Sequence, residues 1–213
     1  AYNILAGGRC LEDLELLRND EQYLNALGAD AIPDPTTAGD FTRRFSQRHI
    51  VALMESVNRI RAKMWTKCLR REERTRAVID ADGVVSPTTG ECKEGMDMAY
   101  NGLWAYHVLL VSLANTMEPL YLVNRSGNRP SHEGAVEWLD RAARWAGKAF
   151  DRVCFRGDTD FALTKEFDRW TGEGKEFVFG VDAMPNVVKL AEGLGEGDWR
   201  ELKRREKKRL SGE

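Results

Sequence analysis

One short stretch, residues 77–85, constrains the fold of this chain more than any other segment. It is a β-branched apolar run with charge before it and a glycine near its end, a pattern typical of a buried central strand. The stretch carries two carboxylates, Asp80 and Asp82, which project from the same face because side chains alternate along a strand. Buried acids need a positive partner, and Mg²⁺ is the usual cation for oxygen ligands. The same residues also fit a strand that ends in a solvated turn capped by one of these acids.

Composition limits the classes of protein to which the chain can belong. Its 213 residues are 42% hydrophobic and 31% charged, which suits one or two soluble domains with a core. The net charge of −2 provides no overall basic field, so any nucleic acid would be met by local patches. The longest apolar run, residues 108–113, is too short to span a bilayer.

Cysteine usage argues against a zinc site. The four cysteines are far apart, and no Cys-x-x-Cys pair occurs: Cys10, Cys68, Cys92 and Cys154. Reduced thiols in a cytosol are the simplest interpretation.

Residues 1–75 read as an all-helical N-terminal region. Asp20 is expected to cap a short helix that ends at Gly28, and Thr37 with Asp40 resembles a capping box. A long amphipathic helix follows, with apolar residues at three- and four-residue spacing from Ile50. Its other face is basic, and either solvation or nucleic-acid binding can explain that charge. The basic residues are Arg59, Arg61, Lys63, Lys67, Arg70 and Arg71.

Residues 76–195 alternate between strand and helix patterns in the order βββαβαβα. After the first strand and a polar loop or hairpin, strands are expected at 103–114, 119–123, 152–156 and 176–180. The first three strands favour an antiparallel meander, whereas a strand–helix–strand order favours parallel pairing. Helices are expected to begin at or near Ser131, Thr164 and Pro185. A basic C-terminal tail completes the chain at residues 196–213.

Two carboxylates follow strands that could be neighbours. Asp82 ends the first strand and Asp158 ends the fourth. In α/β sheets, sites form outside the carboxyl ends of the strands, so parallel neighbouring strands would bring the two acids together. Carboxylates that share a pocket repel each other unless a divalent ion neutralises them. Paired metal ions suit an in-line attack on a phosphodiester.

Several motifs together resemble the catalytic core of bacterial insertion-sequence transposases of the DDE type, which have a ribonuclease H-like fold. The motifs lie in residues 79–83, 102–107, 113–116, 124–134, 156–161 and 177–180. Residues 36–41 resemble the helical region that precedes this core. The resemblance extends over about residues 1–195, and it is specific as a set rather than motif by motif.

The resemblance implies a reaction and a site. Three acids of such proteins hold two Mg²⁺ or Mn²⁺ ions, cut double-stranded DNA at the element's ends and join the 3′ ends to a target. Asp158 matches the second acid by its context, and Asp82 is favoured as the first, with Asp80 as the alternative. Asp82 and Asp158 would therefore be the metal ligands. The resemblance also implies a bacterial cytoplasmic, nucleoid-associated location, a possible homodimer and no membrane partner.

The sequence departs from this family pattern at its end. No glutamate in the expected context follows Leu194, and the late candidates are only Glu201 and Glu206. Together with a start at Ala1 rather than Met, this suggests a product truncated at both ends. Two alternatives therefore stay open. One is a catalytically inactive remnant that binds DNA or oligomerises, and the other is a ribonuclease H-like nuclease.

The remaining polar residues allow functional and structural interpretations. Arg125, Asn128 and Arg129 form a polar loop that either contacts the DNA backbone or is a solvated turn. His132, at an expected helix start, could face a phosphate. His107 and Asp160 are expected to be structural: a hydrogen-bonded core histidine, and a cap for a helix that starts near Phe161.

Overall fold

The computed structural model describes residues 2–89 and 93–201. The chain divides into two compact units, Ala1–Arg74 and Thr75–Glu213. The predicted tail lies outside the described residues from 202 onward, and so does Glu206. Within the described residues, no helix has both the length and the apolar character needed to cross a membrane.

The first unit is all-helical, as the sequence predicts. Five α-helices and one 3-10 helix follow each other: α1 (Tyr2–Leu5), α2 (Leu14–Leu17), α3 (Glu21–Leu27), α4 (Pro35–Thr42), α5 (Gln47–Cys68) and η1 (Arg71–Arg74). The predicted ends of α3 are confirmed. Asp20 accepts hydrogen bonds from two backbone N–H groups of the first turn, and Gly28 ends the helix at φ 64°.

The predicted capping box at Thr37 is wrong. The cap of α4 is Asp34, whose carboxylate accepts hydrogen bonds from the backbone N–H and the hydroxyl of Thr37. Pro35 takes the first helical position, where its missing N–H costs no hydrogen bond. The helix therefore begins two residues before Thr37.

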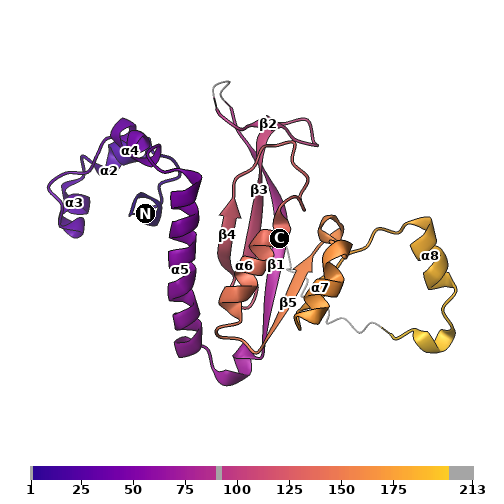
Figure 1. The fold of residues 1–213 in the computed structure, drawn as a ribbon. Helices are drawn as coiled ribbons and strands as arrows, with labels where there is room; N and C mark the ends of the chain where they lie inside the picture. The colour runs from indigo at the N-terminus through magenta and orange to yellow at the C-terminus, as the bar shows by residue number, and fades with distance from the viewer. Residues whose placement is uncertain (1, 90–92, 202–213) are drawn as a thin grey trace, which may run out of the picture. The chain divides into compact units, whose positions relative to one another are not determined.

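The second unit is a mixed α/β fold built on a six-stranded sheet (Figure 1). The strands are β1 (Arg76–Pro87), β2 (Asp97–Met98), β3 (Trp104–Leu113), β4 (Glu118–Val123), β5 (Arg152–Gly157) and β6 (Glu176–Phe179). Their order is β2-β3-β1-β5-β6, and β4 also pairs with β3. β1, β3 and β4 pair antiparallel, whereas β5 is parallel to both β1 and β6. The predicted meander and parallel pairing are thus confirmed, with the two-residue β2 added.

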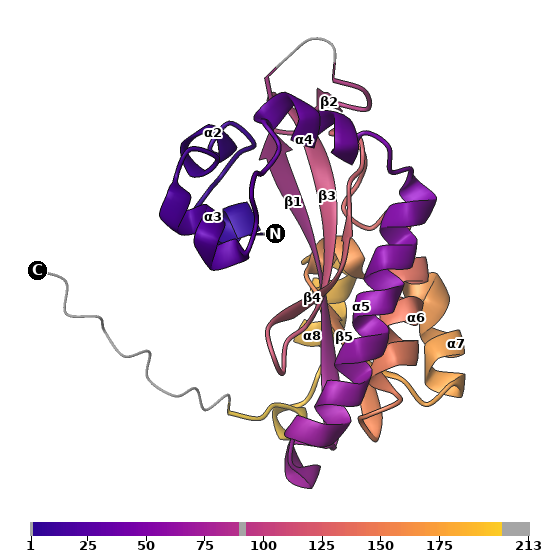
Figure 2. The same cartoon turned by 90° about the vertical axis from the view of Figure 1, so that its left-hand side faces the viewer.

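One face of the sheet is covered by helices. α6 (Ala135–Ala146) contacts four strands, β1, β3, β4 and β5 (Figures 1 and 2). The side chains of β1 that face it, Ala77, Ile79 and Ala81, are buried, and alternate residues of β3 are buried with them. The intervening residues of β1, which include Asp80 and Asp82, therefore lie on the opposite face.

The segment after β5 completes the unit. It comprises η2 (Thr159–Phe161), η3 (Thr164–Glu166), α7 (Phe167–Gly172), β6, α8 (Pro185–Glu192) and η4 (Glu196–Asp198). Trp170 of α7 is fully buried, with its ring centroid 4.8 Å from that of Phe155. Since Phe155 is level with Ile79 in the β1–β5 register, α7 covers the same face as α6.

The predicted helix start at Ser131 is wrong. α6 begins at Ala135, after Gly134 at φ 72°, a left-handed conformation that favours glycine. Ser131 therefore lies in the preceding loop, where its hydroxyl serves another contact.

Candidate functional site

Asp158 directly follows β5, as expected, but Asp82 does not end β1, because β1 continues for five more residues to Pro87 in its antiparallel pairing with β3. The register of β1 and β5 ends at the pair Asp80 and Arg156. Asp82 and Asp158 each follow that pair by two residues. Both are exposed, and the backbone of Asp158 is still extended (φ −78°, ψ −165°). The strand pairing therefore brings these two positions to the same level, just beyond the last pair of β1 and β5, and we call this place the sheet edge.

Asp80 has a cation partner that the sequence analysis missed. The Arg156 guanidinium donates from Nε to Oδ1 and from Nη2 to Oδ2 of Asp80, both at 2.6 Å. This two-point contact raises the pKa of Arg156. The pair lines a pocket of about 430 Å³ on the sheet face opposite α6. Once parallel pairing of the two strands was expected, the strand position of Arg156 could have indicated this contact.

Asp158 has a structural role besides any ligand role. Its Oδ1 accepts the backbone N–H of Asp160, which caps η2. The expectation that Asp160 is the cap is therefore wrong. Asp160 instead accepts the Ser131 hydroxyl at 2.9 Å, which joins the η2 turn to the loop before α6.

His107 is a buried, hydrogen-bonded histidine, as expected. Its Nδ1 lies 2.6 Å from the backbone oxygen of Arg129. Its Nε2 faces Gly83, where an added Cβ would lie 2.7 Å from Nε2 and 2.8 Å from the Ser131 oxygen. Gly83 therefore lets β1 pass close to the loop that carries Ser131.

Arg125 points into its own loop. Its Nε donates to the backbone oxygen of His107, and its Nη1 lies 2.7–3.3 Å from three loop carbonyls, of Pro130, Ser131 and Glu133. Burial lowers the pKa of this guanidinium, and Nη2 is buried without a partner among the described residues. Arg125 thus organises the loop that the sequence analysis considered for DNA contact.

The other polar residues of the loop lie nearer solvent. Asn128 donates to the Asp97 carboxylate at 2.7 Å, which ties the loop to β2. Arg129 forms an ion pair with Glu133 and keeps about half of its side chain exposed (53%).

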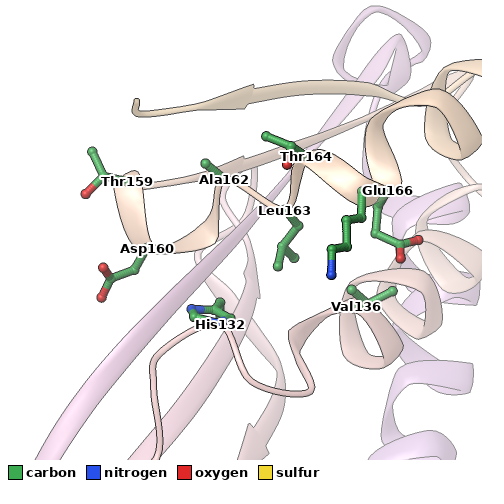
Figure 3. A pocket seen from close by; sticks show the side chains of 9 residues that line it. His132, Val136, Thr159, Asp160, Ala162, Leu163, Thr164 and Glu166 are labelled. Carbon is green, nitrogen blue, oxygen red and sulfur yellow. The ribbon is translucent and has the colours of Figure 1, made fainter. Parts of the chain in front are cut away.

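His132 lines a pocket of about 490 Å³ that opens between the start of α6 and residues 159–166 (Figure 3). Val136 and Leu163 provide apolar lining, and Asp160 and Lys165 are among the charged residues. Two lining residues, Thr159 and Asp160, directly follow Asp158 in the chain, so the pocket lies beside the turn that Asp158 caps.

The donor set at the sheet edge fits one divalent cation better than a complete cluster. Within residues 2–89 and 93–201, no hydrogen bond or ion pair reaches Oδ2 of Asp158 or the carboxylate of Asp82. Carboxylate oxygens are the ligands that Mg²⁺ and Mn²⁺ accept. The same described residues contain no group of three or more His, Cys, Asp or Glu side chains placed to hold a metal.

Comparison with known proteins identifies the family. Residues 1–213 match the family described as transposase DDE domain, group 1. The match covers the whole chain, so the chain belongs to this family of DDE transposase domains. No curated protein matches the chain.

Proposed function

We propose that this protein is a bacterial insertion-sequence transposase that cleaves double-stranded DNA at the element's ends and transfers the 3′ ends to a target. The family assignment supports transposition in general. The observation that carries the detailed proposal is the β1–β5 register, because Asp82 and Asp158 each follow its last pair, Asp80 and Arg156, by two residues.

The proposed core is ribonuclease H-like. An order β4-β3-β1-β5-β6 supports it, with the first three strands antiparallel and the last two parallel to β1. A helix that crosses the sheet between β4 and β5 supports it further. In this topology Asp82 lies on β1 and Asp158 directly follows β5, the neighbouring central strand. Regular elements hold ligands more precisely than long loops do, which supports the proposal.

The proposed cofactor is Mg²⁺ or Mn²⁺, held by Asp82 and Asp158. When bound, it would lower the charge repulsion at the phosphate and activate the attacking oxygen. The chain's own contribution is position. The η2 turn fixes Asp158 through its Oδ1, and the Ser131–Asp160 hydrogen bond ties that turn to the loop beside Gly83.

DNA would reach this edge over residues that are still exposed. Arg129 and His132 are the loop residues proposed to contact phosphate, together with Asn128 at the base of the loop. Arg125 is proposed to hold the loop in shape rather than to contact DNA, because its donors already meet carbonyl oxygens.

A pair of substitutions separates the two roles of Asp158. Asp158→Asn keeps an oxygen that can cap η2 and loses the charge, whereas Asp158→Ala loses both. We expect Asn to leave thermal stability near that of the wild type and Ala to cost about 1 kcal/mol, a typical cap value. Both variants should lose metal-dependent cleavage and strand transfer of a DNA duplex that carries the element's ends.

Asp168→Asn is the matched control, because it removes an exposed carboxylate of α7. Full strand transfer by Asp158→Asn would show that Asp158 is not a ligand.

A second candidate is a catalytically inactive protein that binds DNA or forms oligomers. The absence of a three-ligand cluster among the described residues favours it. Phosphoryl transfer depends mainly on positioning and charge neutralisation, so loss of one acid would cost most of the activity. DNA binding without cleavage in either Mg²⁺ or Mn²⁺ would support this candidate.

A further inference from the structure

Four charged side chains form two rows across β1 and β5. Asp80 is level with Arg156 in the parallel register, and Asp82 and Asp158 follow by two residues. Residues two apart on a strand share a face, so the Arg156 charge lies on the side of the sheet to which Asp82 points. Three carboxylates and one guanidinium therefore share this part of the sheet.

The guanidinium uses both oxygens of one carboxylate. The two Arg156–Asp80 hydrogen bonds are 2.6 Å each, and the planar fork of arginine matches a carboxylate. The pair is only partly buried, with 55% of the Arg156 side chain and 30% of the Asp80 side chain exposed. It can therefore be opened without unfolding the sheet.

From this arrangement we infer that Arg156 withholds Asp80 from the divalent cation, so that the resting protein binds metal through Asp82 and Asp158 only. This inference rests on the proposed function. It agrees with the finding that the described residues contain no group of three carboxylates placed to hold a metal, although Asp82 and Asp158 follow the Asp80–Arg156 pair by only two residues. Arg156 also lowers the local negative charge, which weakens cation binding further.

The test is Mn²⁺ binding to the 213-residue chain without DNA. Binding is measured by isothermal titration calorimetry and by the loss of the electron paramagnetic resonance signal of free Mn²⁺. Arg156→Gln removes the positive charge and releases Asp80. Charges a few ångströms apart at a protein surface interact strongly, so we expect binding about tenfold tighter or more. Unchanged or weaker binding would overturn the inference.

Arg152→Gln is the matched control. Arg152 lies four residues earlier on β5, about 13 Å along the strand, and removing it takes away the same charge. Its partner Glu176 keeps the ion pair with Arg76. Mn²⁺ affinity should stay within about twofold of the wild type, because an exposed charge beyond a Debye length of about 8–10 Å is largely screened. An equal gain from both substitutions would mean a general charge effect and contradict the role of Arg156.

Substitution of Asp80 completes a double-mutant cycle. Asp80→Asn alone leaves the Arg156 charge unpaired and should weaken Mn²⁺ binding several-fold. Asp80→Asn with Arg156→Gln removes the pair together and should return the affinity close to that of the wild type. A double variant that binds as weakly as Asp80→Asn would show that Asp80 is already a ligand, which contradicts the inference.

Failure of the inference and failure of the proposed metal site give different results. Wild-type binding that Arg156→Gln leaves unchanged contradicts the inference alone. If Arg156→Gln binds Mn²⁺ and the wild type does not, the result supports the inference that Arg156 keeps Asp80 from the cation. It contradicts the proposal that Asp82 and Asp158 alone bind a metal ion. Absence of Mn²⁺ binding in every folded variant, with folding checked by circular dichroism, contradicts both.

Discussion

Gly83 lies where β1 passes against the loop before α6. An added Cβ would lie 2.7 Å from His107 Nε2, and the hydrogen bond from His107 to Arg129 holds that ring in place. We expect Gly83→Ala to destabilise the protein by about 1–3 kcal/mol, as overpacking of a tight contact does. The free energy of unfolding in urea measures the effect. Gly172→Ala is the control, because an added Cβ there meets nothing within 4 Å.

Asp140 joins α6 to α7 through three donors, with hydrogen bonds from Arg169 at 2.9 Å, Trp170 at 3.1 Å and Lys175 at 3.2 Å. Partial burial acts to raise the pKa of Asp140, but these hydrogen bonds outweigh it and leave the pKa below its ordinary value. Because the folded pKa is the lower one, the stabilisation is present above the unfolded value of about 3.9. It is lost as the pH falls through the folded pKa.

We expect Asp140→Asn to lower stability at pH 7 by about 1–3 kcal/mol, because the buried Trp170 N–H and two partly exposed cations lose a charged acceptor. The difference from the wild type should shrink as the pH approaches 3. Melting curves at pH 7, 5 and 3 measure it. A constant difference over this range would contradict the ionic role of Asp140.

At the scale of elements, the loop between β4 and α6 depends on Arg125. Its guanidinium donates to the backbone oxygens of His107, Ser131 and Glu133. A lysine has one compact donor group and cannot match this fork. We expect Arg125→Lys to destabilise the protein by about 1–3 kcal/mol in urea unfolding, because buried carbonyls lose their partner. Arg129→Lys should cost less than about 0.5 kcal/mol, since it retains an exposed ion pair with Glu133.

The elements could be predicted from the sequence better than the contacts between them. The apolar run of residues 77–85 and the turn signals around the later strands predicted the central sheet and its parallel and antiparallel pairs. The caps expected at Thr37 and Asp160 were wrong because the nearby carboxylates of Asp34 and Asp158 take that role. The cap expected at Ser131 was wrong because the left-handed Gly134 precedes α6 instead. The Asp80–Arg156 pair needed the register of two strands that are distant in the sequence.

At the scale of the whole molecule, a basic helix stripe and the proposed acidic site lie in different units. The first unit contains α5, on which Arg59, Lys63 and Lys67 are exposed at four-residue spacing and so share one stripe of the helix. The second unit contains the acidic sheet edge at Asp82 and Asp158. This division predicts that the affinity for DNA and the chemistry on DNA can be impaired separately.

Replacement of Arg59, Lys63 and Lys67 by Gln should weaken DNA binding and lower the salt dependence of the binding constant. If each side chain meets one phosphate, the slope of log K against log salt should fall by about 2.7, since each contact contributes about 0.9. The slope is measured by titrating a DNA duplex with the protein at about 50 to 200 mM salt, because counter-ion release sets the salt dependence of binding. Replacement of the exposed Arg144, Lys148 and Lys189 of the second unit removes the same charge and should leave the slope unchanged. Equal slopes for both triple variants would show that the α5 stripe is only a solvated face, and DNA contact would then have to come from the loop before α6.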